Sequence, residues 1–139
     1  MKEKNKKEVK DWYISATHYL TSGFIIPFFV GLLAFVIIFY TAGEENFPKF
    51  VLPLSFLWLV SLWFGVIYSS KYLEKTYIIK NSDKIINLST LYFLIIGILY
   101  RMYNFSLEVD YFIDFLFFFV AVLVFYFASK KYLKNNATN

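Results

Sequence analysis

The chain has 139 residues, of which 59% are hydrophobic and 24% aromatic, and its net charge is +4. So large an apolar share is atypical of a soluble domain and predicts an integral membrane protein whose surface meets a lipid bilayer. Because 12 of the 14 Lys and Arg residues lie in segments that flank apolar runs, we attribute the charge to membrane topology and expect no nucleic-acid partner.

Residues 1–20 are predicted to form a cytoplasmic and interfacial segment. Its apolar residues recur at helical spacing, whereas Lys10, Asp11 and Thr17 fall elsewhere on the helix. This pattern predicts a short amphipathic helix at the membrane surface. The apolar positions are Val9, Trp12, Tyr13, Ala16, Tyr19 and Leu20.

The first predicted membrane helix covers residues 21–43. Its apolar core from Phe24 to Ala42 has 19 residues. At about 1.5 Å per residue this gives about 28 Å of helix, enough to cross the hydrocarbon of a bilayer. Pro27 cannot donate a backbone hydrogen bond to the carbonyl of Gly23, so a bend is expected there.

The second and third predicted helices cover residues 49–73 and 84–103. The second contains 21 consecutive uncharged residues from Phe50 to Ser70, whereas the third contains only 16 from Ile85 to Tyr100. The third is therefore a little short for the hydrocarbon thickness. Ser82 is its predicted N-cap, with Asp83 favourably placed in the first turn.

The fourth predicted helix covers residues 108–129 and is followed by a cytoplasmic tail, residues 130–139. Only 15 residues, Phe115 to Ser129, are free of charge. The helix therefore reaches spanning length only if Asp114 enters the membrane boundary. Ser106 is the expected cap at its start.

The distribution of Lys and Arg predicts the orientation. With the amino terminus inside, twelve of these residues lie in cytoplasmic segments and two, Lys49 and Arg101, lie outside. Short loops rich in Lys and Arg stay in the cytoplasm, so both termini are expected there, in the plasma (inner) membrane of a prokaryote. We thus expect an all-α membrane protein: a four-transmembrane-helix bundle built from two helical hairpins, with residues 1–139 forming a single integral membrane domain.

A stripe of small residues runs along one face of the second predicted helix. Small side chains let helix backbones approach closely in lipid, where packing drives association. The first predicted helix carries a matching face and is the favoured partner; a second copy of the chain is the alternative. The residues are Ser61, Gly65 and Ser69, facing Gly23, Pro27 and Gly31.

A cluster of acids is predicted on the external side. Charged groups at a membrane boundary are expected to pair or to face water, so Arg101 should reach Asp110 or Asp114 across the connection between the last two helices. We favour the interpretation that the acids cap and solvate helix ends; a cation-concentrating mouth or a proton site is the alternative. The cluster consists of Glu44, Glu45, Glu108, Asp110 and Asp114, with Arg101 as the nearest cation.

No catalytic motif, cofactor motif or metal-ligand spacing is present in the sequence. The single histidine, His18, has no neighbouring ligand, and the chain has no cysteine. We expect no enzyme activity, no metal and no cofactor. No ionisable residue lies near the middle of a predicted span, which counts against an ion-coupled transporter.

Three functions therefore stay open. The small-residue stripe favours a non-enzymatic accessory or interaction subunit, in a homo-oligomer or a larger membrane complex. The first alternative is an oligomeric cation channel or small transporter, suggested by the external acids. The second is a protein that handles lipids or other hydrophobic molecules, suggested by the aromatic content and the Pro27 position.

Overall fold

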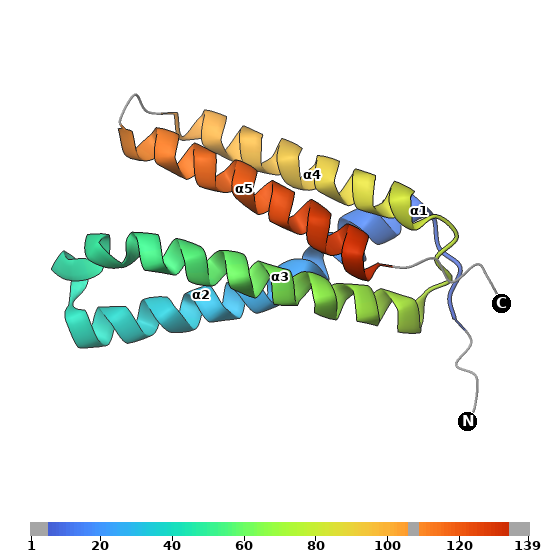
Figure 1. Cartoon of the computed structure of the whole chain (residues 1–139), viewed down its shortest axis with the longest axis horizontal. Coiled ribbons are helices and arrows are strands. Elements are labelled where there is room, and N and C mark those ends of the chain that lie inside the picture. The colour runs from blue at the N-terminus through green and yellow to red at the C-terminus, as the bar shows by residue number, and fades with distance from the viewer. Residues whose placement is uncertain (1–5, 106–108, 134–139) are drawn as a thin grey trace.

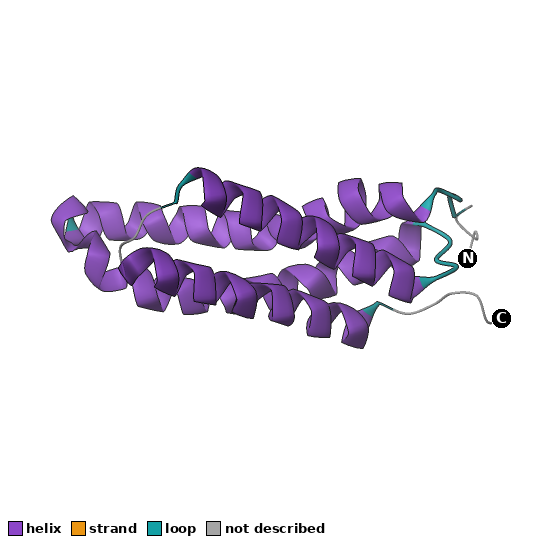
Figure 2. Cartoon of the chain, turned by 90° about the horizontal axis from the view of Figure 1, so that it is seen from above, coloured by secondary structure: helices purple, strands orange, loops and turns teal. Residues whose placement is uncertain are grey.

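The computed structural model describes residues 6–105 and 109–133, except for the Asp110 side chain. Every element that it describes is helical (Figure 2), and four helical rods are long and apolar enough to cross a membrane. The first rod joins three elements and the second joins two. In chain order the elements are α1 (Asp11–Tyr13), the π-helix η1 (Ile14–Tyr19), α2 (Leu20–Ala42), the 3-10 helix η2 (Glu44–Phe50), α3 (Val51–Thr76), α4 (Ser82–Tyr103) and α5 (Val109–Tyr132).

The long helices lie side by side in a bundle. α2 packs along α3, α4 packs along α5, and α3 contacts α5. Figure 1 shows that the α2–α3 pair and the α4–α5 pair come together at the end where residues 77–81 connect α3 to α4, and diverge toward the opposite end. We call these the closed end and the open end of the bundle.

The core lies toward the closed end because the small residues are there. Gly65 of α3 packs directly on the backbone of Gly23 and on Pro27 of α2. The hydroxyls of Ser69 and Ser22 lie 2.6 Å apart across the same contact. Such close approach and hydroxyl bonding are what hold helices together in lipid. The stripe therefore packs within the chain.

The segment before α2 packs differently from the amphipathic helix that the spacing predicts. Ile14 and Ser15 are fully buried, whereas Trp12 and Tyr13 are exposed. The reason is the π-helix, whose wider turn shifts the residues that face the bundle away from α-helical spacing. The hydroxyl of Ser69 donates to the carbonyl of Tyr19 at 2.8 Å, so α3 stabilises the end of this π-helix.

The residues before α1 close the bundle at that end. The amide of Lys7 donates to the Thr76 carbonyl at 3.0 Å, and the amide of Ile78 donates to the Lys7 carbonyl at 3.1 Å. Two ion pairs reinforce this contact, one between Glu8 and Lys80 and one between Asp11 and Lys84, the latter at 3.3 Å. The amino-terminal segment is thereby tied to the connection between α3 and α4.

The start of α4 corrects one sequence prediction. The N-cap is Asn81 and not Ser82: the Asn81 side-chain oxygen accepts from the Lys84 amide at 2.9 Å, and Ser82 is the first helical residue. Asp83 lies in the first turn, as expected. Asparagine is an equally good cap, so the local sequence offered two adjacent candidates. The expected cap at Ser106 lies outside the described residues.

Candidate ligand-binding cavity

A cavity of about 780 Å³ lies between the diverging helix pairs. Residues from α2, η2, α3, α4 and α5 line it, and most of them are apolar. Its volume falls within the range of small-molecule sites, which are typically apolar with a few polar groups. The aromatic part of the lining consists of Phe24, Phe35, Phe47, Trp58, Phe93, Tyr100, Phe117 and Phe118.

Aromatic packing separates this cavity from the core at the closed end, where Ser22, Ser69 and Ser70 are buried. The rings of Phe24 and Phe93, which line the cavity, lie 4.8 Å apart between centroids in an edge-to-face arrangement. Both also contact the fully buried Phe125, which in turn contacts Tyr19. The Tyr19 hydroxyl lies 3.2 Å from that of Ser70, so the packing continues without a break into the closed end.

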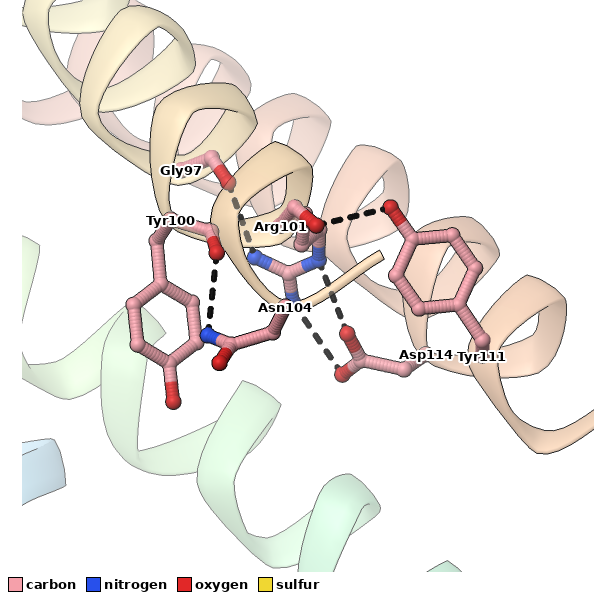
Figure 3. Close-up of polar contacts among 6 residues, drawn as sticks. All are labelled: Gly97, Tyr100, Arg101, Asn104, Tyr111 and Asp114. Atoms are coloured by element: carbon pink, nitrogen blue, oxygen red, sulfur yellow. Dashed lines mark hydrogen bonds and ion pairs between the residues drawn. The ribbon is translucent and has the colours of Figure 1, made fainter. Parts of the chain in front are cut away.

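The two charged residues of the cavity wall form an ion pair between α4 and α5. Arg101 Nη2 donates to Asp114 Oδ1 at 3.1 Å, and Arg101 Nε lies 2.8 Å from Asp114 Oδ2 (Figure 3). The second contact is an ion pair only, because the Nε hydrogen is not aligned for a hydrogen bond. The structure thus joins Arg101 to one of its two expected partners.

The two members of the pair differ in burial. The Arg101 side chain is 16% exposed, whereas that of Asp114 is 58% exposed. Both line the cavity. The pair therefore presents a positive charge on its buried side and a negative charge on its exposed side.

Gly97 and Phe118 both contact the Arg101 side chain. The guanidinium carbon lies 4.3 Å from the centroid of the Phe118 ring. The ring reaches this position because Gly97 has no side chain: a methyl group there would lie 2.1 Å from Phe118 Cε2. The Gly97 carbonyl also accepts a long hydrogen bond of 3.4 Å from Arg101 Nη1. A cation over an aromatic face is electrostatically stabilised, most strongly when water is excluded.

The end of α4 is fixed to α5 by its backbone as well. The Tyr111 hydroxyl donates to the Arg101 carbonyl at 2.9 Å, and the Asn104 side chain donates to the Tyr100 carbonyl at 3.0 Å (Figure 3). The Arg101 carbonyl lies in the last turn of α4, where carbonyls lack partners within the helix, and Tyr111 supplies one from α5. The Tyr100 carbonyl accepts the Asn104 amide as well, at 3.2 Å, so Asn104 closes the end of α4 itself. The position of Arg101 is thus set from both its backbone and its side chain.

The remaining residues of the predicted acidic cluster lie apart from this pair or cannot be placed. Glu44 and Glu45 begin η2 and are exposed. Glu108 and the Asp110 side chain lie outside the part of the chain that the structure describes. The cluster therefore contributes one well-defined cavity residue, Asp114.

The small-residue stripe is divided between the core and the cavity. Ser61, Gly65 and Ser69 are buried on α3, facing Gly23 and Pro27. Gly31, in contrast, lines the cavity, where a methyl group would meet only Trp58, at 3.9 Å. The close contact with a neighbouring backbone that occurs at Gly65 is absent at Gly31. The lack of a side chain at residue 31 therefore enlarges the cavity.

The single histidine lies at the closed end and away from the cavity. Its ring packs between those of Tyr13 and Tyr77, with centroid separations of 5.4 and 5.1 Å. This is a ring-packing role within the amino-terminal contact. Within residues 6–105 and 109–133, no three His, Asp or Glu side chains gather as a candidate metal site.

No protein-family model, curated protein or solved structure matches this chain.

Proposed function

We propose that this chain is a non-catalytic membrane protein that binds a lipid or a similar amphiphile between its two helix pairs. The observation that carries the proposal is the cavity of about 780 Å³, apolar over most of its wall and with an ion pair between α4 and α5. A site with apolar walls and one polar region suits a molecule with a long apolar part and a polar head. Such molecules surround a membrane protein at high concentration.

The same geometry weighs against the two other functions. The small-residue stripe favours an interaction subunit, but its residues Gly65 and Ser69 are used in the contact between α3 and α2. A channel through one copy of the chain requires a continuous polar path, whereas Phe24, Phe93 and Phe125 pack together beyond the cavity, so an oligomeric channel would need its path between copies. The cavity supports a bound ligand better than a pore.

We also propose that each helix pair is a hairpin and that both termini face the cytoplasm. The support is the gathering of lysines at the closed end, where Lys80 and Lys84 pair with residues of the amino-terminal segment. Lysine-rich segments are retained on the cytoplasmic side. The open end, with Arg101 and Asp114, would then face outward. Reporter tags at the two chain ends should both report a cytoplasmic location; opposite locations would overturn this topology.

Filling the cavity should remove the ligand. Gly31→Phe places a ring in the cavity, whereas Leu33→Phe adds the same ring to an exposed position, 63% accessible, on the same helix. Ser55→Phe is a second cavity-filling variant from α3. Each protein would be purified from membranes in mild detergent, checked for helix content and thermal stability, and analysed by native mass spectrometry.

We expect the unmodified chain and Leu33→Phe to retain a bound amphiphile, and folded Gly31→Phe and Ser55→Phe to lose it. Equal retention in all four proteins would place the bound lipid on the outer surface and overturn the proposal. So would the absence of any retained amphiphile from the unmodified chain when lipid is supplied during purification.

A further inference from the structure

We infer that the cavity selects a zwitterionic phospholipid, with the phosphate on Arg101 and the ammonium group at Asp114. This inference rests on the proposed function and specifies the ligand. Three features favour this ligand: the different burial of the two charges, the geometry of the guanidinium, and the charge around the open end.

The burial of the two charged residues matches the order of groups in such a lipid. The aromatic wall of the cavity suits acyl chains, Arg101 is 16% exposed, and Asp114 is 58% exposed. A phospholipid presents its groups in the same sequence: apolar chain, phosphate, then ammonium. A lipid lying with its chains in the cavity would therefore bring each head group to the residue of opposite charge.

Charge pairing favours a head that carries both signs. The Arg101–Asp114 pair has no net charge, and its arginine is largely buried. A purely anionic head that displaced Asp114 from Arg101 would leave the carboxylate unpaired at the membrane boundary, which is costly. A zwitterionic head supplies a partner to each residue. A neutral head satisfies neither, so it gains nothing from displacing the existing pair.

The guanidinium is arranged to accept a phosphate. Phe118 covers its face at 4.3 Å, which leaves the N–H groups around its edge to bind oxygen. Nε and Nη2 face Asp114 at 2.8 and 3.1 Å, whereas Nη1 makes only the 3.4 Å contact to Gly97. When Asp114 turns to an ammonium group instead, the Nε–Nη2 edge becomes free for a phosphate. Two phosphate oxygens could be bound side by side, the geometry that arginine prefers.

The charge at the open end of the bundle favours a ligand whose outermost group is a cation. Glu44 and Glu45 are exposed in η2, the element that contributes Phe47 to the cavity wall. Lys49 of the same element keeps its positive charge, so the two glutamates and this lysine leave η2 with a net charge of −1. Acids beside the opening raise the local concentration of an ammonium group and repel a head with net negative charge.

The test is a competition between lipids that share their acyl chains. The full-length protein in detergent would be titrated with dioleoyl phosphatidylethanolamine, dioleoyl phosphatidylglycerol or dioleoylglycerol, and separately with inorganic phosphate, and binding would be measured by native mass spectrometry. We expect the ethanolamine lipid to bind about tenfold more tightly than either other lipid. We expect inorganic phosphate neither to bind detectably nor to displace lipid.

Two variants assign the head groups. Asp114→Asn removes the ammonium partner and should reduce or reverse the preference for ethanolamine over glycerol phospholipid. Arg101→Gln removes the phosphate partner and should reduce both phospholipids to the affinity of dioleoylglycerol. Lys10→Gln, an exposed change at the closed end, should leave all three affinities unchanged.

The outcomes separate this inference from the proposed function. If lipids bind in the cavity with no head-group preference, with preference for the anionic lipid, or with a preference that Asp114→Asn leaves unaltered, the zwitterion assignment is wrong while the lipid site stands. Displacement of lipid by inorganic phosphate would identify a general anion site and also overturn the assignment. If no lipid binds at all, the proposed function fails with it.

Discussion

Gly65 packs against Gly23 so closely that a methyl group at residue 65 would lie 2.0 Å from the Gly23 carbonyl oxygen. Because the obstacle is backbone, Gly65→Ala must push α2 and α3 apart. Overpacking of this kind typically costs about 1–3 kcal/mol, and separating two helices places the effect at the upper end. Denaturant-induced unfolding in detergent micelles, followed by far-UV circular dichroism, would measure the loss of stability.

Gly31→Ala is the matched control for that substitution. A methyl group at residue 31 makes an ordinary contact with Trp58 at 3.9 Å. Both glycines lie within helices, so both substitutions gain the same helix propensity, about 1 kcal/mol. We expect Gly31→Ala to be neutral or slightly stabilising. If Gly65→Ala were equally well tolerated, the close contact between α2 and α3 would be wrong.

Gly97→Ala should be destabilising for a different reason, and less so than Gly65→Ala. The added methyl group would lie 2.1 Å from Phe118 Cε2, which is a side-chain atom and can move. Moving the ring takes it from beneath Arg101, at a cost of about 0.5–2 kcal/mol. In a Phe118→Leu background the ring is absent, so the same Gly97→Ala change should cost much less. Additive effects of the two substitutions would show that residues 97 and 118 do not interact.

Arg101 and Asp114 should be energetically coupled. A cycle of Arg101→Gln, Asp114→Asn and the double variant should give a coupling free energy of about 0.5–3 kcal/mol. The value should lie toward the lower end, because the Asp114 side chain is 58% exposed. Asp114→Asn leaves a largely buried guanidinium without its carboxylate, so the double variant should be more stable than the two single losses predict. A coupling of zero in denaturant unfolding would contradict the pair.

The sequence predicts the helices and the ion pair because each depends on local information. Uncharged runs long enough to cross a bilayer are directly visible, and the described helices coincide with them within a few residues. The acids at the start of the fourth predicted helix have few possible partners, because Arg101 is one of only two Lys or Arg residues between the basic segments. Its pairing with an acid at the start of the next helix follows from the short connection between them.

The cavity could not be predicted because it depends on the angle between helix pairs. Gly31 and Gly65 look alike in the sequence, yet one lines a cavity and the other touches a backbone. The aromatic lining carries no signal either, since 24% of the chain is aromatic and Phe occurs on every face. Gly97 is a glycine within a helix, which suggests close packing at that position. The sequence does not show that the packing partner is Phe118.

The closed end supplies the last prediction, a pH dependence set by Glu8 and Lys80. The hydrogen bond from Lys80, together with its charge, lowers the pKa of Glu8 below the ordinary 4.5, and Glu8 in turn raises the pKa of Lys80 above 10.5. The depressed carboxyl stabilises the amino-terminal contact above pH 4.5, an effect lost as the pH falls through its lowered pKa. The raised ammonium stabilises it below pH 10.5, an effect lost as the pH rises through the raised pKa.

The pair therefore contributes between these limits, and its carboxyl can be titrated directly. In protein labelled with carbon-13 at glutamate side chains, the Glu8 carboxyl signal should show a midpoint below 4.5, and Lys80→Met should return it to that value. Lys84→Met is the control, because Lys84 pairs with Asp11 instead and should leave the Glu8 midpoint in place. A Glu8 midpoint that Lys80→Met does not move would show that residues 8 and 80 are not paired in solution, and that the backbone bonds of Lys7 hold the closed end without them.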